Sequence, residues 1–252
     1  MIVCAVAAVL VVAAHASAAP AGSANSEAPT IARCDDDVSG EEHMLRELIA
    51  QSFPALAHVA IKLKPFHSDS DYFRTSFSAH RFAFGMKMQY VVLVNREWRS
   101  RSAPIEGVRS ILAHELAHIE DLSHGKRIGL FRLVGLATHE GTARFERRAD
   151  LTTMARGYGA GLEAYRAWLY GHIPESKVAE KRRDYFSPEE IEAALAAAAT
   201  RPALFDCWTH DVPLAFTSRR NACRVHPGRA PVRPCETRSG GRPHQRIRVT
   251  RA

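Results

Sequence analysis

The segment His114-Glu115-Leu116-Ala117-His118 lies inside a stretch, Val108–His124, that contains neither Pro nor Gly. Apolar side chains recur through this stretch at steps of three and four residues, which is typical of a helix with one buried face. These apolar residues are Val108, Ile111, Leu112, Leu116 and Ile119. The sequence therefore predicts an amphipathic helix that carries both histidines and the glutamate between them.

Two histidines four residues apart lie on the same face of a helix, so the imidazoles of His114 and His118 can reach one metal ion. Glu115, next to the first of them, can reach a water molecule at that metal. This H-E-x-x-H spacing is a signature of zinc hydrolases, and it predicts a metalloprotease with one Zn²⁺ per chain. The contrasting interpretation is a surface helix with two histidines that bind nothing.

A catalytic zinc usually has a third protein ligand and an open position for water. Glu146 is the first candidate, because it lies on a second predicted helix, Thr142–Met154, with Asp150 four residues later on the same face. One carboxylate could bind zinc, and the other could accept a hydrogen bond from a ligand histidine and so fix its orientation.

His124 is the second candidate, since His114, His118 and His124 have the ligand spacing of the metzincins. Asp121 stands where those proteins have the Gly that turns the chain sharply out of the helix. The third ligand is therefore left open between Glu146 and His124, with Asp121 a lesser choice.

The two motifs together resemble those of the gluzincin metalloproteases, and the Glu146-Arg147-Arg148-Ala149-Asp150 segment looks most like that of the CAAX prenyl-protease-like and HtpX-like peptidases. The resemblance covers roughly residues 88–168. It implies a zincin-like α+β fold, mainly helical, with a small mixed sheet beside the metal helix. It also implies His114, His118 and Glu146 as zinc ligands, Glu115 as general base and Asp150 as the partner that positions a ligand histidine.

The expected reaction is hydrolysis of peptide bonds, in which Glu115 takes a proton from a water activated by zinc and passes it to the leaving amine. A further donor should stabilise the oxyanion, and the sequence does not rank the four candidates His124, His139, Tyr158 and Tyr165. Residues 88–94 form either an edge strand that pairs with an extended peptide or an ordinary interior strand.

Patterns of residue type outline the remaining elements. Residues 41–51 read as a helix with Ser39 as a possible cap, and residues 57–94 are the most strand-like region, with an alternating run at 59–63. Gly157 and Gly159 should end the second helix, and residues 165–170 belong to a third. Ser187, Pro188 and Glu190 mark the start of another helix.

The N-terminus and the cysteines indicate export. Residues 1–18 read as a secretory signal peptide with cleavage near Ala18, or as a retained membrane anchor, and no later stretch could span a membrane. Four cysteines remain after such cleavage and could form two disulfides in a secreted or periplasmic protein. They are Cys34, Cys207, Cys223 and Cys235.

The 252 residues suffice for one catalytic domain, expected at residues 39–205 after a linker at 19–38. Residues 206–252 read as a largely disordered basic tail, because residues 217–252 hold ten Arg against one Glu, a formal +9 in a chain of net +7. An anionic cell-envelope surface is its expected partner, beside a protein or peptide substrate, and nucleic acid is disfavoured. The alternative from another class is a cell-envelope binding or assembly protein on a metalloprotease fold.

Overall fold

The computed structural model describes residues 38–78, 81, 84, 86–124, 138–214 and 216. The chain divides into two units, residues 1–222 and 223–252, and all the described residues belong to the first. The expected signal peptide, the expected linker up to residue 37 and the part of the expected 206–252 tail that follows residue 216 lie outside the described residues. Cys34, Cys223 and Cys235 lie there too, so the disulfides stay a prediction.

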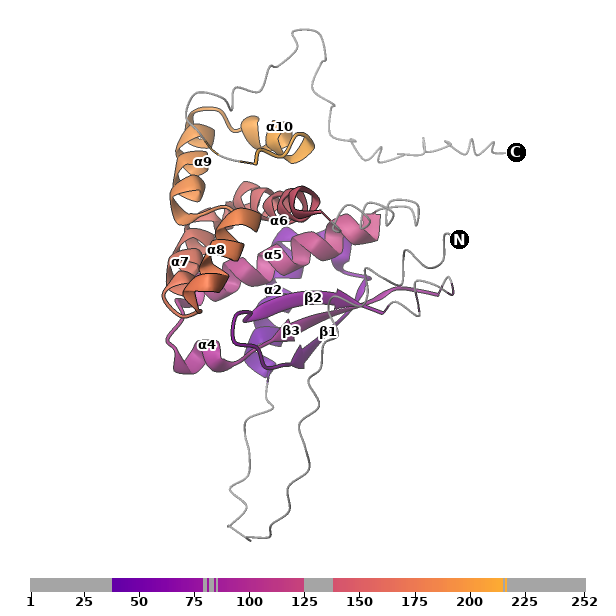
Figure 1. Ribbon diagram of the computed structural model, residues 1–252. Helices are drawn as coiled ribbons and strands as arrows, with labels where there is room; N and C mark the ends of the chain where they lie inside the picture. Colours follow the sequence, from indigo (N-terminus) through magenta and orange to yellow (C-terminus); the bar gives the residue numbers. More distant parts are fainter. Residues whose placement is uncertain are drawn as a thin grey trace, which may run out of the picture. The chain divides into compact units, whose positions relative to one another are not determined.

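The described residues form a mainly helical structure with one small mixed sheet, which confirms the α+β class (Figure 1). The elements in chain order are α2 (Ser39–Ser52), η2 (Pro54–Leu56), β1 (Ala60–Pro65), β2 (Phe73–Phe77), β3 (Gln89–Val94), α4 (Glu97–Ser100), α5 (Ile105–His124), α6 (His139–Thr153), η4 (Met154–Tyr158), α7 (Gly159–Tyr170), α8 (Glu175–Asp184), α9 (Pro188–Thr200) and α10 (Leu204–His210).

The sheet has the strand order β1-β3-β2, with β1 parallel and β2 antiparallel to β3. Every second residue of β3 is buried, which is the pattern of a strand with one face on the core: Tyr90, Val92 and Val94. The stretch at 88–94 is thus a strand, as predicted. It is the central one, so the interior-strand alternative holds and the edge-strand alternative is wrong.

β2 is the strand that lies at the sheet edge beside α5. The N–H of Asn95 donates to the Tyr72 carbonyl at 2.8 Å, and the N–H of Ser78 donates to the Gln89 carbonyl at 3.4 Å. Hydrogen-bonded pairs alternate along an antiparallel ladder, so residues 73, 75 and 77 turn their backbone N–H and C=O groups away from β3. Within the described residues these groups form an open edge.

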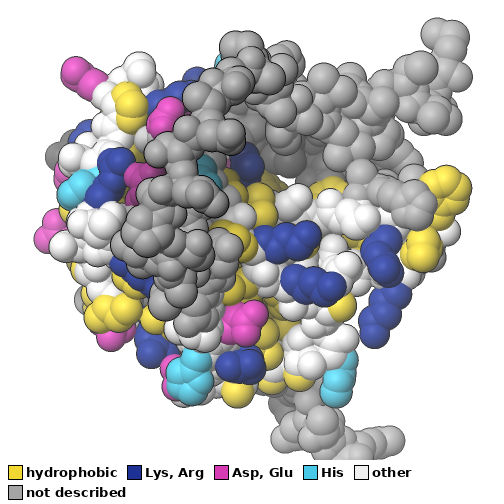
Figure 2. Space-filling view, turned by 90° about the horizontal axis from the view of Figure 1, so that it is seen from below, with side chains coloured by type: hydrophobic (Ala, Val, Ile, Leu, Met, Phe, Trp, Pro, Cys, Tyr) yellow, Lys and Arg dark blue, Asp and Glu magenta, His cyan; other side chains and the backbone are white. Residues whose placement is uncertain are grey.

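The side of the molecule on which the sheet lies carries basic side chains between hydrophobic ones (Figure 2). The exposed residues of the strands themselves include Lys62 and Lys64 on β1 and Arg74 on β2. The Arg74 guanidinium lies 5.3 Å from the centre of the Phe66 ring. Positive charge in this chain is therefore also present on the described sheet face, and not in the C-terminal tail alone.

α5 is the central helix and runs between the sheet and the helices α6 and α7 (Figure 1). It begins at Ile105, one turn before the predicted start, and runs through His124. α7 packs against it at two glycines: a Cβ on Gly107 would lie 3.1 Å from the Tyr165 Cβ, and one on Gly161 would collide with Ser110 Oγ and the Glu106 carbonyl. The close approach of α5 and α7 therefore requires residues without side chains at these points.

The chain between α6 and α7 departs from the prediction. α6 begins earlier than expected, at His139, where the Thr138 side chain caps it by accepting from the Gly141 N–H at 3.0 Å. After Thr153 the chain makes a π-helical turn, η4, in which Gly157 has φ +90°. Gly159 is the first residue of α7 and not the end of a helix, so only Gly157 fits its predicted role.

Two predicted helix starts have different outcomes. Ser187 and Glu190 form a reciprocal capping box with Pro188 in the first turn of α9, as predicted. α2 begins at Ser39 itself with Val38 in the cap position, so the expected Ser39 cap is wrong.

The packed part of the described chain continues past residue 205, since Trp208 and Val212 are buried. None of the helices in the described ranges is both long and apolar enough to cross a membrane.

Replacing Gly161 with Ala should lower the free energy of unfolding by about 1–3 kcal/mol, because the new methyl group forces α5 and α7 apart. The measurement is urea denaturation of the metal-free protein. Gly40→Ala is the matched control, since the nearest foreign atom there is 3.7 Å away and Ala favours a helix by up to about 1 kcal/mol. Equal stability of the two variants would contradict the close-packing explanation.

Candidate metal centre

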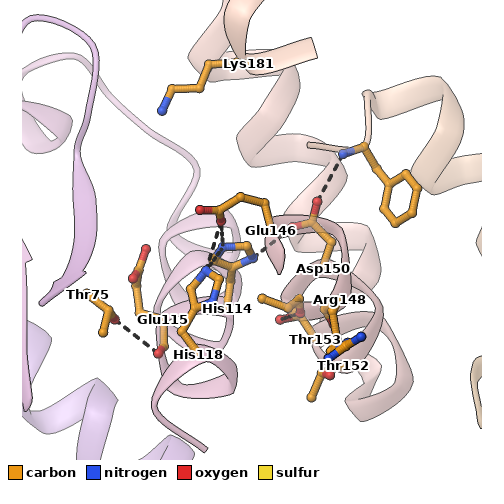
Figure 3. Close-up of polar contacts among 12 residues, drawn as sticks. Thr75, His114, Glu115, His118, Glu146, Arg148, Asp150, Thr152, Thr153 and Lys181 are labelled. Carbon is orange, nitrogen blue, oxygen red and sulfur yellow. Dashed lines mark hydrogen bonds and ion pairs between the residues drawn. The ribbon is translucent and has the colours of Figure 1, made fainter. Parts of the chain in front are cut away.

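His114 and His118 lie one turn apart on the face of α5 that α6 covers, and both are buried. Their rings meet edge to face with centroids 4.6 Å apart. The two Nε2 atoms are 3.0 Å apart, and both rings point toward α6 (Figure 3). The spacing of four residues thus brings two metal-ligand atoms to one point, as the sequence predicts.

Glu146 reaches the same point from α6. Its Oε2 lies 2.9 Å from His118 Nε2 and 3.3 Å from His114 Nε2 (Figure 3). Within the described residues, these three side chains form the group of His, Cys, Asp or Glu residues whose ligand atoms converge closely enough to hold a metal ion. Glu146, the first candidate for third ligand, is brought to the two histidines.

The distances fit a zinc ion. Ligand atoms held at 2.0–2.1 Å from one tetrahedral zinc lie roughly 3.3 Å from each other. The three separations here are 3.0, 2.9 and 3.3 Å. Two imidazoles and one carboxylate are also a common ligand set of catalytic zinc. The residues present therefore fit this metal without rearrangement of the backbone.

Asp150 lies behind His114 and is fully buried. Its Oδ1 is 2.8 Å from His114 Nδ1 and also accepts from the Arg166 guanidinium at 3.0 Å. Its Oδ2 accepts from the Phe186 N–H at 3.2 Å. A carboxylate in this place fixes which ring nitrogen of His114 faces the metal point and raises the basicity of that nitrogen.

The charges in the cluster favour a cation. Burial alone would lower the pKa of His114, but the carboxylates of Asp150 and Glu146 outweigh it and raise that pKa to about 9. Burial would raise the pKa of Glu146, yet His118 and His114 hold it well below its ordinary value. Burial also opposes ionisation of Asp150, whose pKa is lowered nevertheless by Arg166 and His114. Both acids stay ionised beside the histidines, which suits the binding of a cation between them.

A cleft of about 280 Å³ opens beside the cluster, between β2, α5 and α6. Glu115 lines it and is only 4% exposed. Its carboxylate makes no hydrogen bond or ion pair with another described residue, and its oxygens are not among the buried polar atoms without a partner, so they reach the open space of the cleft. A buried carboxylate that reaches a cleft without a partner in the described protein is free to interact with water or a bound molecule.

β2 is fixed against the same cleft. The Thr75 hydroxyl donates to the backbone carbonyl of Glu115 at 3.2 Å, so the edge strand is tied to α5 at the residue that follows the first histidine (Figure 3). Phe73, Thr75 and Phe77 line the cleft from the strand. These are also the residues whose backbone groups turn away from β3, so the open edge borders the cleft.

Tyr185 is a cleft residue that the sequence did not single out. It follows α8, lines the cleft, and its ring centre lies 6.0 Å from that of His114. Burial, and then the carboxylate of Glu146, raise the pKa of Tyr185 well above its ordinary value, so its hydroxyl keeps its proton. The hydroxyl makes no hydrogen bond with any other described residue. No local pattern marks Tyr185, because its proximity depends on the packing of α8.

Three of the four residues expected as oxyanion donors lie away from the cluster. Tyr158 shares a hydrogen bond of 2.7 Å with Ser52, and Tyr165 is buried against Phe73 and Trp168. His139 begins α6 as an exposed residue. These three do not line the cleft.

The side chain of His124 lies outside the described part of the chain. His124 is the last residue of α5, and the helix is continuous through Asp121. The sharp turn that a metzincin arrangement requires after His118 is therefore not formed at Asp121. This geometry favours Glu146 as the third ligand.

Comparison with protein-family models, with curated proteins and with solved structures gives no match to this chain. The interpretation of the site therefore rests on the geometry of its own residues.

Metal content should separate the two candidates for third ligand. We expect one zinc per chain in the wild type, loss of zinc in Glu146→Ala, and full zinc content in His124→Ala. The measurement is inductively coupled plasma mass spectrometry of protein dialysed against zinc. Loss of zinc in His124→Ala alone would overturn the choice of Glu146.

Proposed function

We propose that this chain is an exported, zinc-dependent metalloendopeptidase of the gluzincin type with a zincin-like fold. The observation that carries the proposal is the convergence of His114, His118 and Glu146 next to Glu115, a buried carboxylate that has no partner among the described residues. Export is supported by the sequence alone, through residues 1–18 and the four remaining cysteines.

Zinc bound by these three residues would supply a Lewis acid that polarises a peptide carbonyl and makes water acidic enough to lose a proton near neutral pH. The protein's part is to hold the two imidazoles and the carboxylate at fixed separations. Asp150 contributes by holding the ring of His114, because its carboxylate lies 2.8 Å from the nitrogen that faces away from the metal point.

Glu115 is the proposed general base. It lines the cleft beside His118, so its carboxylate can accept a proton from the attacking water and return it to the leaving amine. The hydrogen bond between Thr75 and the Glu115 carbonyl fixes the backbone from which this side chain extends. A site that only binds a molecule has no need of a base in this position.

The open edge of β2 supports a polypeptide substrate. Backbone groups of residues 73, 75 and 77 can pair with an extended chain that lies along the cleft. Such backbone pairing gives affinity that does not depend on the amino-acid sequence of the substrate. The aromatic rings of Phe73, Phe77, Phe145 and Tyr185 line the cleft and favour apolar side chains of that substrate.

Two other functions are distinguished by experiment. One is a cell-envelope binding or assembly protein that keeps a metalloprotease fold, and the other is a zinc hydrolase of cell-wall peptides or other amides. Digestion of a peptide library beside cell-wall material separates peptide-bond hydrolysis from the second alternative. Glu115, which has no partner among the described residues, argues against a protein that only binds or assembles.

Replacing Glu115 with Gln should leave zinc bound and reduce peptide cleavage by at least roughly 10²-fold, since the amide cannot accept the proton. Zinc content and the rate of cleavage of a quenched fluorescent peptide are measured on the same preparation. Glu120→Gln, five residues further along α5 where the side chain pairs with Arg156, is the control and should cleave like the wild type. Cleavage by Glu115→Gln at the wild-type rate would remove Glu115 from the mechanism.

Replacing Tyr185 with Phe should lower kcat by about 10²-fold with little change in KM, if the hydroxyl donates to the oxyanion that forms during hydrolysis. The ring is kept, so the wall of the cleft is unchanged. Tyr158→Phe, which removes a hydroxyl bound to Ser52 away from the cleft, is the control. An unchanged kcat in Tyr185→Phe would exclude this role.

A further inference from the structure

Arg166 on α7 is the largest fully buried side chain of the described residues. Its guanidinium donates to Asp150 Oδ1 at 3.0 Å, and its carbon Cζ lies 4.1 Å from the centre of the Tyr185 ring. It therefore contacts two residues that belong to different parts of the metal centre. Asp150 holds a metal ligand, and Tyr185 lines the cleft.

The ion pair explains how Asp150 can stay in place. A carboxylate that is 0% exposed is unfavourable unless it is paired and hydrogen-bonded. Oδ1 of Asp150 is shared between Arg166 and His114, whereas Oδ2 accepts from the Phe186 N–H. With Arg166 absent, Oδ1 would have His114 alone as its partner, and the carboxylate would lose the contact that fixes it from behind.

The stacking contact extends the effect to the cleft. Tyr185 lies between the guanidinium of Arg166 and the cleft, and Lys181 Nζ is 5.1 Å from the centre of the same ring. A cation over the face of an aromatic ring is attracted to it, and more strongly where solvent is excluded. One buried cation thus supports both the ligand side and the substrate side of the centre.

We propose that Arg166 is a positioning residue, which holds Asp150 against His114 and the Tyr185 ring against the cleft, and so sets the metal affinity of the centre. This inference rests on the proposed metal centre, since it needs a metal at His114, His118 and Glu146. It goes beyond that proposal because Arg166 contacts neither the metal point nor the cleft.

Arg147 provides a matched control. It is also a buried arginine, it pairs with Glu190 at 3.3 Å, and its Cζ lies 4.7 Å from the centre of the Phe186 ring. It has no contact with Asp150 or His114. Its loss removes the same kind of ion pair and ring contact but leaves the contacts of Arg166 with Asp150 and Tyr185 in place, and the Phe186 N–H can still donate to Asp150 Oδ2.

The experiment compares full-length wild type, Arg166→Met and Arg147→Met. Zinc affinity is measured by competition with a chromophoric chelator, and the visible absorption spectrum is recorded with Co²⁺ in place of zinc. We expect Arg166→Met to bind zinc about 10- to 100-fold more weakly and to show an altered Co²⁺ spectrum, because the partner of a ligand histidine is displaced. Arg147→Met should keep both properties and lose only thermal stability.

A double-mutant cycle tests the route through Asp150. If Arg166 acts on His114 through that carboxylate, Arg166→Met added to Asp150→Asn should cause little further loss of zinc affinity. Fully additive losses would overturn the inference, and so would equal losses in Arg166→Met and Arg147→Met. If Arg166→Met does not fold, Arg166→Gln replaces it with the same expected loss, and wild-type affinity in that variant would overturn the inference.

Failure of the metal centre itself looks different. A wild type that binds no zinc would contradict the proposed function and not the role of Arg166 alone. If the wild type binds zinc and the Arg166→Met variant binds it equally well, only the role of Arg166 is contradicted.

Discussion

The contact of one carboxylate oxygen, Glu146 Oε2, with two imidazole nitrogens is the interaction on which the site depends. It requires α6 to lie across the His114–His118 face of α5, close enough for Glu146 to reach both rings. This placement is supported by α7, which packs on α5 through Gly161 and connects to α6 through the turn at Gly157. The helix packing is thus part of the metal centre, because a shift of either helix would separate the ligand atoms.

Buried charge in this region is balanced step by step. Going outward from the metal point, Glu146 faces the two histidines, His114 faces Asp150, and Asp150 faces Arg166. His114, Asp150 and Arg166 are buried and Glu146 is half-buried, and each stays compatible with the low dielectric because its neighbour has the opposite charge or donates to it. Glu115 is the exception, since it is buried beside the same cluster without a partner among the described residues. The contrast separates groups that hold the centre from one that is available for chemistry.

Much of this arrangement follows from local sequence patterns. The parts that could not be predicted were all missed for one physical reason. The helix with both histidines, the i,i+4 pair Glu146 and Asp150, the capping box at Ser187 and the strand at 89–94 are each encoded within a few neighbouring residues. The position of β2 at the sheet edge was missed because strand order depends on pairing between distant segments, and no local pattern in residues 73–77 predicts that order. Tyr185 and Arg166 were missed for the same reason: their neighbours at the site lie on other helices, as with Arg166 and Asp150, 16 residues apart. Tertiary packing alone brings them to the site.

The number of ligands bears on whether the centre is structural or catalytic. Structural zinc sites are usually closed by four protein ligands, whereas catalytic sites keep one position open. The residues that the structure describes bring three ligand atoms together, and the side chains next to them are Glu115 and the cleft wall formed by β2 and Tyr185. The proposed open position, which faces Glu115 and the β2 edge that no other described strand covers, suits a substrate whose own backbone can pair with that strand. A metal held only to stabilise the fold would gain nothing from either feature, so the arrangement supports the proposed hydrolysis of a polypeptide over a purely structural metal site.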